Sequence, residues 1–564
     1  MPFTPPVREQ RLVLGTIAGI ADLGVDDDTV DAVLEGAGEF AAGEWAPLAR
    51  TGDTVGAKWT PEGVVMPQGF RAAYQAYVEG GWGTIGVAEA FGGQGLPFAL
   101  QTAVLESLGT ANMAFALCPT LTVGAIEALQ HHGSPEQQAL YLPKLATGEW
   151  TGTMNLTEPQ AGSDVGALRS AATPLGDGKW SIKGTKIYIS FGDHDMADNI
   201  VHLVLARTPG APAGTRGISL FLVPKYRLNA DGTPGAFNDV RVVSIEHKMG
   251  LHASPTCVLS FGDHDDCVGE LIGAEHAGMR AMFTMMNNAR LNVGLQGVQV
   301  AEGATQAAVA YALDRVQGAR AGAAARIVEH PDVRRMLLRM KAQTQAARAL
   351  VYYSAGQVDR AARGDAAAKN RLELVTPLAK AHATDLGNEV ASLGIQVHGG
   401  MGYVEETGAA QFFRDARITP IYEGTNGIQA ADLVGRKLAL GHDEEGGGAF
   451  AALISDIRAD AQDERLNALV DACEAVGRRL RTADADDRLA ASYPFLTMLS
   501  VATCAWLLVR EAAALTGEDN FAQMKRAAVR FYLEQIVPEA LGLQSAATAD
   551  AGVLYAVPAE AFAA

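Results

Sequence analysis

The sequence predicts a mainly α-helical protein with a central β domain and an extra helical domain at its C-terminal end. Apolar residues recur at the helical spacing of three and four before residue 150 and again after residue 276. Between these stretches lie short alternating or β-branched runs, separated by Gly, Pro and Asp. The 564 residues exceed what one core usually holds, so we expect three or four packed units.

Four domains follow from these patterns. Ser134, with Glu136 and Gln137 in the next turn, predicts a helix start near the end of the first domain. A Gly-Gly-Gly run at 446–448 predicts the boundary before the last domain. We expect an N-terminal helical domain, a middle β domain, a helix bundle and an appended helical domain at residues 1–150, 151–275, 276–440 and 441–564.

The middle of the chain predicts strands and the part after it predicts long helices. Five strands are expected, at 180–190, 199–206, 217–223, 239–246 and 255–261. Because no helical segment separates them, they predict a small antiparallel sheet or barrel and not a nucleotide-binding βαβ unit. Three long helical segments then predict a helix bundle, at 279–315, 332–364 and 369–393.

Composition excludes several classes of protein. The net charge is 45 − 64 = −19, which disfavours nucleic acid and anionic membranes as partners. The five cysteines are scattered and include no Cys-x-x-Cys pair, so neither a disulfide framework nor a zinc site is indicated. The apolar segment 493–509 contains Pro494 and is short for a membrane span, so we interpret it as a buried helix. With no secretory signal visible at the start, a cytoplasmic protein is expected.

Two motif-rich stretches have ordinary structural explanations when taken singly. Residues 154–164, Met-Asn-Leu-Thr-Glu-Pro-Gln-Ala-Gly-Ser-Asp, form a turn-rich loop with many backbone N–H groups and hydroxyls. Residues 396–403, Gln-Val-His-Gly-Gly-Met-Gly-Tyr, carry glycines that let backbone approach a phosphate or a flat ring closely. A capped loop and a helix stop, respectively, are the alternative interpretations.

A third stretch, residues 414–429, contains a candidate general base. Glu423 stands between an apolar pair and a Gly-Thr-Asn-Gly loop. Partial desolvation there raises the pKa of a carboxyl group above its reference of about 4.3, toward the strength of a general base. Thr425 is placed to cap the helix that follows.

Together, in this order and spacing, the three stretches resemble the acyl-CoA dehydrogenase family of flavoproteins. The matching patterns are T-E-P-x-A-G-S-D, Q-x-x-G-G-x-G-Y and R-D-x-R-I-x-x-I-Y-E-G-T, and the resemblance covers residues from about 75 to 440. It implies a helical domain, a β domain and a four-helix bundle that bind FAD. It further implies oxidation of an acyl-CoA thioester to a trans-2-enoyl-CoA, electron-transfer flavoprotein as electron acceptor, and a homo-oligomer, with a dimer favoured.

The resemblance implies catalytic and substrate roles for individual residues. Glu423 matches the base that abstracts the α-proton, and its backbone N–H matches a donor that polarises the thioester carbonyl. Some relatives carry the base on the helix near Met279, but the corresponding position here is Ala289. The residues that match substrate-binding positions are Ser163, at the pantetheine arm, Arg290, near the CoA channel, and Gly424.

The resemblance also implies a set of FAD-binding residues. The flavin ring would be bound by Met154, Leu156 and Thr157, with Ser190 in place of the usual threonine and Tyr188 in place of the usual tryptophan. The adenine and pyrophosphate side would be bound by Gln396, Val397, Gly400 and Thr425. Arg315 matches an arginine that reaches FAD phosphate from a neighbouring subunit, although Gln317-Gly318-Ala319 replaces the usual sequence after it.

Further features are similar to the longer bacterial members of the family. The sequence Phe-Gly-Asp-His-Asp occurs at 191–195 and 261–265, which strand-end turns explain more simply than a metal site, so no metal is expected. The first copy and the extra C-terminal domain resemble 3-methylmercaptopropionyl-CoA dehydrogenases and broad-range fatty acyl-CoA dehydrogenases. The implied substrate is 3-methylmercaptopropionyl-CoA or a short or medium fatty acyl-CoA; a broad or long-chain substrate is the alternative.

Three other functions remain open at this point. An acyl-CoA oxidase would pass its electrons to oxygen, and flavin reoxidation under air distinguishes it. A non-catalytic DNA-binding relative needs a basic face, whereas residues 441–564 hold 10 basic and 19 acidic side chains, a net charge of −9. A membrane-attached long-chain enzyme needs a Lys/Arg-rich amphipathic helix, which the acidic C-terminal part disfavours.

Overall fold

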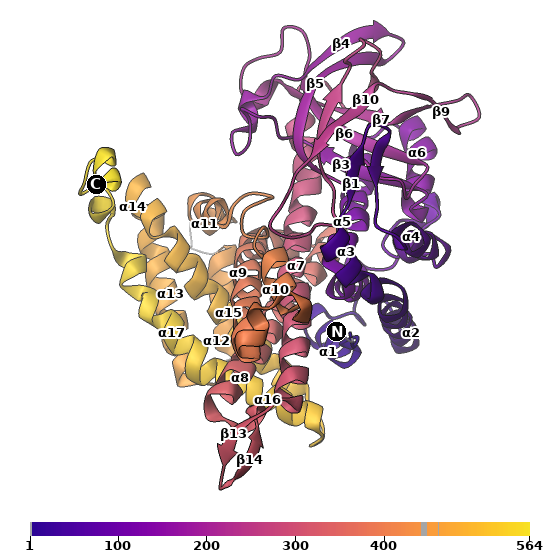
Figure 1. The fold of residues 1–564 in the computed structure, drawn as a ribbon. Helices are drawn as coiled ribbons and strands as arrows, with labels where there is room; N and C mark the ends of the chain where they lie inside the picture. Colours follow the sequence, from indigo (N-terminus) through magenta and orange to yellow (C-terminus); the bar gives the residue numbers. More distant parts are fainter. Residues whose placement is uncertain (1–2, 442–447, 461) are drawn as a thin grey trace. The chain divides into compact units, whose positions relative to one another are not determined.

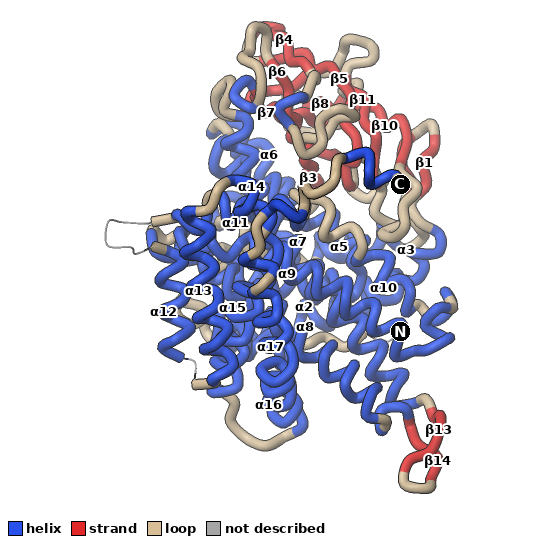
Figure 2. Tube along the Cα trace, turned by 90° about the vertical axis from the view of Figure 1, so that its left-hand side faces the viewer, coloured by secondary structure: helices blue, strands red, loops and turns tan. Residues whose placement is uncertain are grey.

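The computed structural model describes residues 3–441, 448–460 and 462–564 (Figures 1 and 2). These residues form two compact units. The unit that we call the sheet unit comprises Glu35–Ala289. The unit that we call the bundle unit comprises Pro6–Leu34 and Arg290–Ala564. The predicted boundary at 446–448 lies outside the described residues except for Gly448.

Glycines end the helices α3 (Ala49–Val55), α4 (Phe70–Glu79), α5 (Phe98–His132) and α6 (Pro135–Thr147) of the sheet unit, and the last of them begins at a side-chain cap. Ser134 accepts a hydrogen bond from Gln137 N at 3.2 Å, and the Gln137 side chain accepts one from Ser134 N at 3.0 Å, which confirms the predicted helix start. Gly148, at φ 85°, ends the same helix. These helices precede the sheet, while α2 (Asp27–Phe40) spans the unit boundary.

An eight-stranded sheet forms the centre of this unit, and all five predicted strands are present. Its order is β10-β11-β5-β12-β7-β6-β3, with β4 pairing to β5 and β6. The strands are β3 (Trp150–Asn155), β4 (Ala171–Gly176), β5 (Lys179–Ser190), β6 (Asn199–Arg207), β7 (Ile218–Pro224), β10 (Val240–Ile245), β11 (Thr256–Phe261) and β12 (Val268–Ile272). Separate two-stranded pairs are β1 (Lys58–Thr60) with β2 (Gly63–Val65), and β8 (Tyr226–Leu228) with β9 (Pro234–Phe237).

The prediction of a purely antiparallel sheet is wrong at one edge. β3 pairs with β6 in parallel, in register from Trp150 opposite Asn199 to Asn155 opposite Val204. The intervening β4–β5 hairpin supplies the long connection that parallel neighbours require. The sequence does not predict this pairing. β3 is polar at every second position, so its residues resemble the start of the loop that follows.

The core of the sheet unit lies on both faces of the sheet. On one face Leu203 and Leu205 of β6 belong to a cluster that includes Leu129 of α5 and Leu142 of α6. On the other face Val204 belongs to a second cluster, which includes residues of β5, β7 and β11. Burial on both faces explains why β6 is apolar almost throughout instead of alternating.

The bundle unit contains the three long helices that the sequence predicts. They are α7 (Gly278–Asp314), which begins in the sheet unit, α8 (Pro331–Ala362) and α9 (Ala366–His398). The shorter elements are α1 (Val7–Val13), α10 (Ala409–Ala416), α11 (Asn426–Gly435) and a hairpin of β13 (Val316–Arg320) and β14 (Ala323–Arg326). The hairpin was not predicted, because its Gln-Gly-Ala-Arg-Ala-Gly sequence has no strand-like alternation.

Residues after 448 form further helices of the same unit. They are α12 (Ala449–Asp460), α13 (Glu464–Thr482), α14 (Ala485–Ala490), α15 (Ser492–Ala514), α16 (Asn520–Phe531) and α17 (Val537–Leu541). α15 packs against α8, α9, α11 and α13, which confirms the predicted buried helix at 493–509. By length and composition α5 and α15 could each cross a membrane, but 83% and 78% of their most apolar windows are buried inside the structure.

Candidate active site

Glu423 lies in a short, tightly turned loop of the bundle unit between α10 and α11. Its φ is 53° and that of Gly424 is 82°, so two consecutive residues are in the left-handed region. Such a backbone is uncommon for a residue with a side chain and costs energy, and it is concentrated at functional sites. Thr425 ends the turn by capping α11, its Oγ1 accepting a hydrogen bond from Ile428 N at 3.1 Å.

The environment of Glu423 combines burial with two cations. Burial raises the pKa of Glu423, as the sequence predicts, while the charges of Arg290 and Lys380 lower it. Arg290, on α7, is 8% exposed, and its Nε has no hydrogen-bond partner among the side chains that the structure describes. Lys380, on α9, is fully buried and was not identified from the sequence. This half-buried carboxylate can therefore serve as a base beside compensating positive charge.

The glycine-rich segment after α9 supplies an open backbone surface. α9 ends at His398, followed by Gly399 at φ 61°. Gln396 and Gly400 are exposed and Val397 is buried. A Cβ atom added to Gly400 would meet no atom within 4 Å, so space lies free in front of this backbone.

Arg315 lies at the end of α7, where the chain enters the β13–β14 hairpin. Its side chain is exposed, and its carbonyl accepts a hydrogen bond from Ile327 N at 2.8 Å, which closes the base of the hairpin. An exposed arginine at the start of the hairpin is available to bind a phosphate.

In the sheet unit, the end of β3 and the residues after it are held by β5. Met154 is 9% exposed in the core, while Leu156 and Thr157 are half-buried. Ile187 N donates to Thr157 O at 3.0 Å, which ties this loop to the strand.

A buried ion pair between Lys186 and Glu158 fixes the same loop. The sequence did not predict this pair. Lys186 Nζ donates to Leu156 O at 3.0 Å and to Glu158 Oε1 at 2.9 Å. Glu158 also accepts from Arg169 N and Ser170 N, at 2.7 and 3.0 Å. Burial opposes ionisation of Glu158, but Lys186 and these hydrogen bonds bring its pKa to about 2. The available signal was that Lys186 shares the inward face of β5 with Ile182.

A β-bulge in β5 turns Tyr188 outward. Cys257 pairs with Ile189 but Leu259 pairs with Lys186, so β5 holds one extra residue against β11. Tyr188 lies in this bulge at φ 60° and is 61% exposed. Ser190 follows at the strand end, opposite Thr256, and is half-buried. Ser163 is exposed in the loop after β3.

The first Phe-Gly-Asp-His-Asp copy fixes the β1–β2 hairpin. Asp193 accepts a hydrogen bond from Val64 N at 2.9 Å and pairs with Lys225, while Asp195 accepts from Met66 N at 3.1 Å. His194 is buried and contacts Thr151 Oγ1 at 2.9 Å, and burial lowers its pKa to about 3.

The second copy contributes one surface ion pair, that of Asp265 with Lys183. His264 Nδ1 lies 3.0 Å from Oδ1 of the buried Asp239. In the described parts of the chain, no group of three His, Cys, Asp or Glu side chains is arranged to hold a metal ion.

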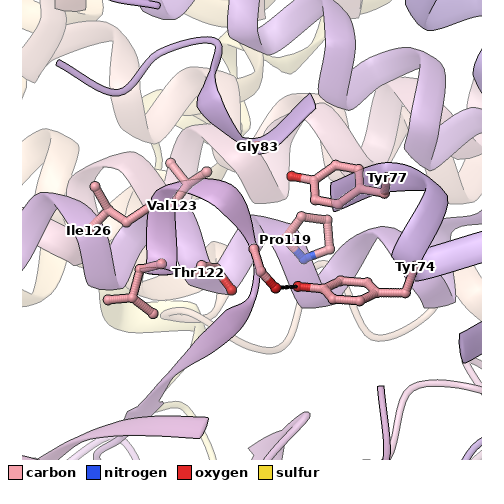
Figure 3. A pocket seen from close by; sticks show the side chains of 9 residues that line it. Tyr74, Tyr77, Gly83, Pro119, Thr122, Val123 and Ile126 are labelled. Atoms are coloured by element: carbon pink, nitrogen blue, oxygen red, sulfur yellow. Dashed lines mark hydrogen bonds between the residues drawn. The ribbon is translucent and has the colours of Figure 1, made fainter. Parts of the chain in front are cut away.

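A small cavity lies in the sheet unit beside α4, α5 and α6 (Figure 3). Tyr74 and Tyr77 line it from α4, and Pro119, Thr122 and Ile126 line it from α5. Tyr74 OH donates a hydrogen bond to Gly148 O at 2.8 Å, so the hydroxyl donor of this tyrosine already has an acceptor within the protein.

Comparison with known proteins identifies the family. Three models match the chain: acyl-CoA dehydrogenase N-terminal domain at 27–149, middle domain at 153–264 and C-terminal domain at 276–438. A fourth, acetyl-CoA dehydrogenase C-terminal like, matches 449–558. The chain belongs to the acyl-CoA dehydrogenase family, whose members catalyse FAD-dependent dehydrogenation of acyl-CoA thioesters.

Individual relatives agree with this result over nearly the whole chain. The chain is 44% identical to 3-methylmercaptopropionyl-CoA dehydrogenase of Ruegeria pomeroyi over 546 residues, covering 91% of each protein. It is 37% identical to a butyryl-CoA dehydrogenase of Syntrophomonas wolfei, covering 96% of this chain and 94% of the relative. The fold is similar to that of an acyl-CoA dehydrogenase complexed with FAD from Bacillus anthracis, at a TM-score of 0.75 and 22% identity, covering 93% and 88%. The predicted fold class and family, with an extra C-terminal domain, are confirmed.

Proposed function

We propose that Glu423 is the base that removes the α-proton of an acyl-CoA thioester. The observation that carries this proposal is the carboxyl group of Glu423, which lies in a strained, half-buried loop. Burial raises the pKa of this group. By resemblance to the family, the backbone N–H of Glu423, together with Gly424 and Arg290, would bind the thioester and stabilise the developing enolate. Ser163 would contact the pantetheine arm.

The residues present fit FAD, which when bound accepts the β-hydride of the substrate. The exposed ring of Tyr188, turned outward by the bulge, offers a flat surface, and the half-buried Ser190 offers a hydroxyl group. The open backbone at Gly400 and the exposed guanidinium of Arg315 suit a phosphate-bearing tail. The remaining members of the FAD-binding set are Met154, Leu156, Thr157, Gln396, Val397 and Thr425.

The relatives and the sequence support proposals for the acyl group, the partners and the location. The 44% identity to a 3-methylmercaptopropionyl-CoA dehydrogenase favours that thioester, or a short or medium fatty acyl-CoA, as substrate. We further propose electron-transfer flavoprotein as electron acceptor, a homodimer and a cytoplasmic location. The division into four domains at 150, 275 and 440 remains a proposal as well.

Anaerobic mixing of the FAD-loaded protein with a series of acyl-CoAs tests this function. The series contains propionyl-, butanoyl-, 3-methylmercaptopropionyl- and palmitoyl-CoA, and the loss of visible flavin absorption is followed. We expect rapid bleaching by the 3-methylmercaptopropionyl or the short acyl thioesters. Fast bleaching by palmitoyl-CoA alone would instead establish a long-chain enzyme, and fast reoxidation under air would indicate an oxidase.

A further inference from the structure

A chain of hydrogen-bonded polar side chains begins next to the Glu423 loop and extends to α15. Lys380 and Asn426 are buried, Asp385 is half-buried, and Tyr493 is 38% exposed. Lys380 Nζ donates to Asn426 Oδ1 at 2.9 Å, and Asn426 Nδ2 donates to Asp385 Oδ1 at 2.8 Å. Tyr493 OH, from α15, donates to Asp385 Oδ2 at 2.7 Å. All four residues belong to the bundle unit. Lys380 and Asp385 both lie on α9, so two of these hydrogen bonds join α9 to Asn426 of α11 and one joins α9 to α15 of the appended domain.

Asn426 is fixed in this chain by further contacts. Its Nδ2 also lies 3.0 Å from Thr384 Oγ1 and 3.1 Å from Ala381 O, and its backbone N donates to Pro420 O at 2.9 Å. It is 3% exposed. Asn426 is the third residue after Glu423. The hydrogen-bonded chain of side chains therefore fixes the end of the loop that carries the proposed base.

Lys380 places a positive charge in this buried region. It is fully buried, and its hydrogen bond goes to a neutral amide. Burial lowers its pKa to about 8, while the charges of Glu423 and Asp385 act in the opposite direction. A cation in this position favours the ionised form of a nearby carboxyl group, and the effect is strong because water is excluded.

Other charged groups face the same residues. Arg290 acts on Glu423 together with Lys380, and Asp432 and Arg436 act on Arg290. Arg417 acts on Asp385. Arg290 lies on α7 and Lys380 on α9, so removal of Lys380 leaves one of the two cations in place.

We propose that Lys380 is a positioning residue for the reaction: its ammonium group keeps Glu423 ionised, and the Asn426–Asp385–Tyr493 chain holds that ammonium in place. The appended domain thereby contributes to catalysis through Tyr493. This inference rests on the proposed role of Glu423 as the base.

The pH dependence of anaerobic flavin reduction in Lys380→Met and Lys380→Gln tests the proposal. Both variants remove the charge, but glutamine retains a donor for Asn426. Because a neutral residue 380 makes Glu423 harder to ionise, we expect the acidic limb of the rate profile to move to higher pH by about one unit or more in both variants. Tyr493→Phe should move it in the same direction by less. Tyr532→Phe, a buried tyrosine of the same domain whose hydroxyl lies beside Cys504, is the matched control and should leave the profile unchanged.

A second readout does not depend on turnover. Infrared titration of the protonated carboxyl band, referenced to Glu423→Gln, should show the same shift of the Glu423 pKa. FAD content and thermal unfolding establish that each variant is folded. If the Lys380 variants do not fold, Tyr493→Phe still tests the hydrogen-bonded chain of side chains. This inference is overturned if the pH–rate profiles of Lys380→Met and Lys380→Gln coincide with that of wild type. If Lys380→Gln alone has the wild-type profile, the charge of Lys380 is not what acts on Glu423. Near-normal reduction in Glu423→Gln overturns the proposed function itself, which separates the two failures.

Discussion

At the scale of single residues, the buried pair of Lys186 and Glu158 explains how the loop after β3 keeps its shape. Their side chains are 0% and 4% exposed, and Lys186 also binds the backbone at Leu156. Lys186→Met leaves a buried carboxylate uncompensated, so we expect a loss of about 3–5 kcal/mol in the free energy of unfolding. Urea denaturation measures this loss.

The matched double variant and the pH dependence check this explanation. Lys186→Met with Glu158→Gln should recover part of the loss, because no buried charge remains. The pKa of Glu158 is lowered to about 2, so its contribution to stability is present above about pH 4.5 and disappears as the pH falls through 2. Wild-type stability in Lys186→Met would show that the pair does not fix the loop.

At the scale of elements, Lys525 joins three helices. It lies on α16, is fully buried, and pairs with Glu9 of α1 at 2.8 Å and with Glu511 of α15. Gln345 of α8 donates to the same Glu9 at 2.8 Å. The network connects the N-terminal helix with the appended domain inside the bundle unit.

We expect Lys525→Met to destabilise the bundle unit by about 3–5 kcal/mol, measured by urea unfolding. Burial raises the pKa of Glu511 to about 7, so its carboxylate form destabilises the fold above that pH. Because Lys525 lowers this pKa, its removal moves the pKa of Glu511 still higher, and the variant should regain stability as the pH falls from above 7 toward 4.5 and Glu511 takes up a proton. Lys144→Met is the control, because that lysine forms a 44%-exposed ion pair and its loss should cost less than about 1 kcal/mol. Equal losses in both variants would contradict the role of the network.

The elements also show how far the sequence predicts the fold. Helical spacing predicts α7, α8 and α9, and alternation predicts β5, because local periodicity reports these faces directly. The parallel β3–β6 pair and the bulge at Tyr188 depend on contacts between distant segments, which periodicity does not report. The candidate base is predicted from its motif, but Lys380 and Lys186 are not, since a lysine in an apolar stretch gives no sign of which carboxylate it faces.

At the scale of the whole molecule, the appended domain is part of the bundle unit and not a separate body. Arg339 of α8 contacts Glu539 of α17 with both terminal nitrogens, at 2.7 and 2.8 Å, and Arg371 of α9 pairs with Asp456 of α12 at 2.7 Å. Residues 441–564 carry a net charge of −9, which disfavours binding of a phosphate backbone. The extra domain thus extends the core that supports the Glu423 loop.

The most direct test of the central claim is single-turnover flavin reduction in Glu423→Gln, compared with wild type under anaerobic conditions. Glutamine keeps the volume of the side chain but cannot accept the α-proton. We predict that the variant retains FAD and that reduction by butanoyl- or 3-methylmercaptopropionyl-CoA slows by at least ~100-fold, as expected for the loss of a general base. Reduction at a rate close to that of wild type, in a variant with full FAD content, would contradict the assignment of Glu423 as the base.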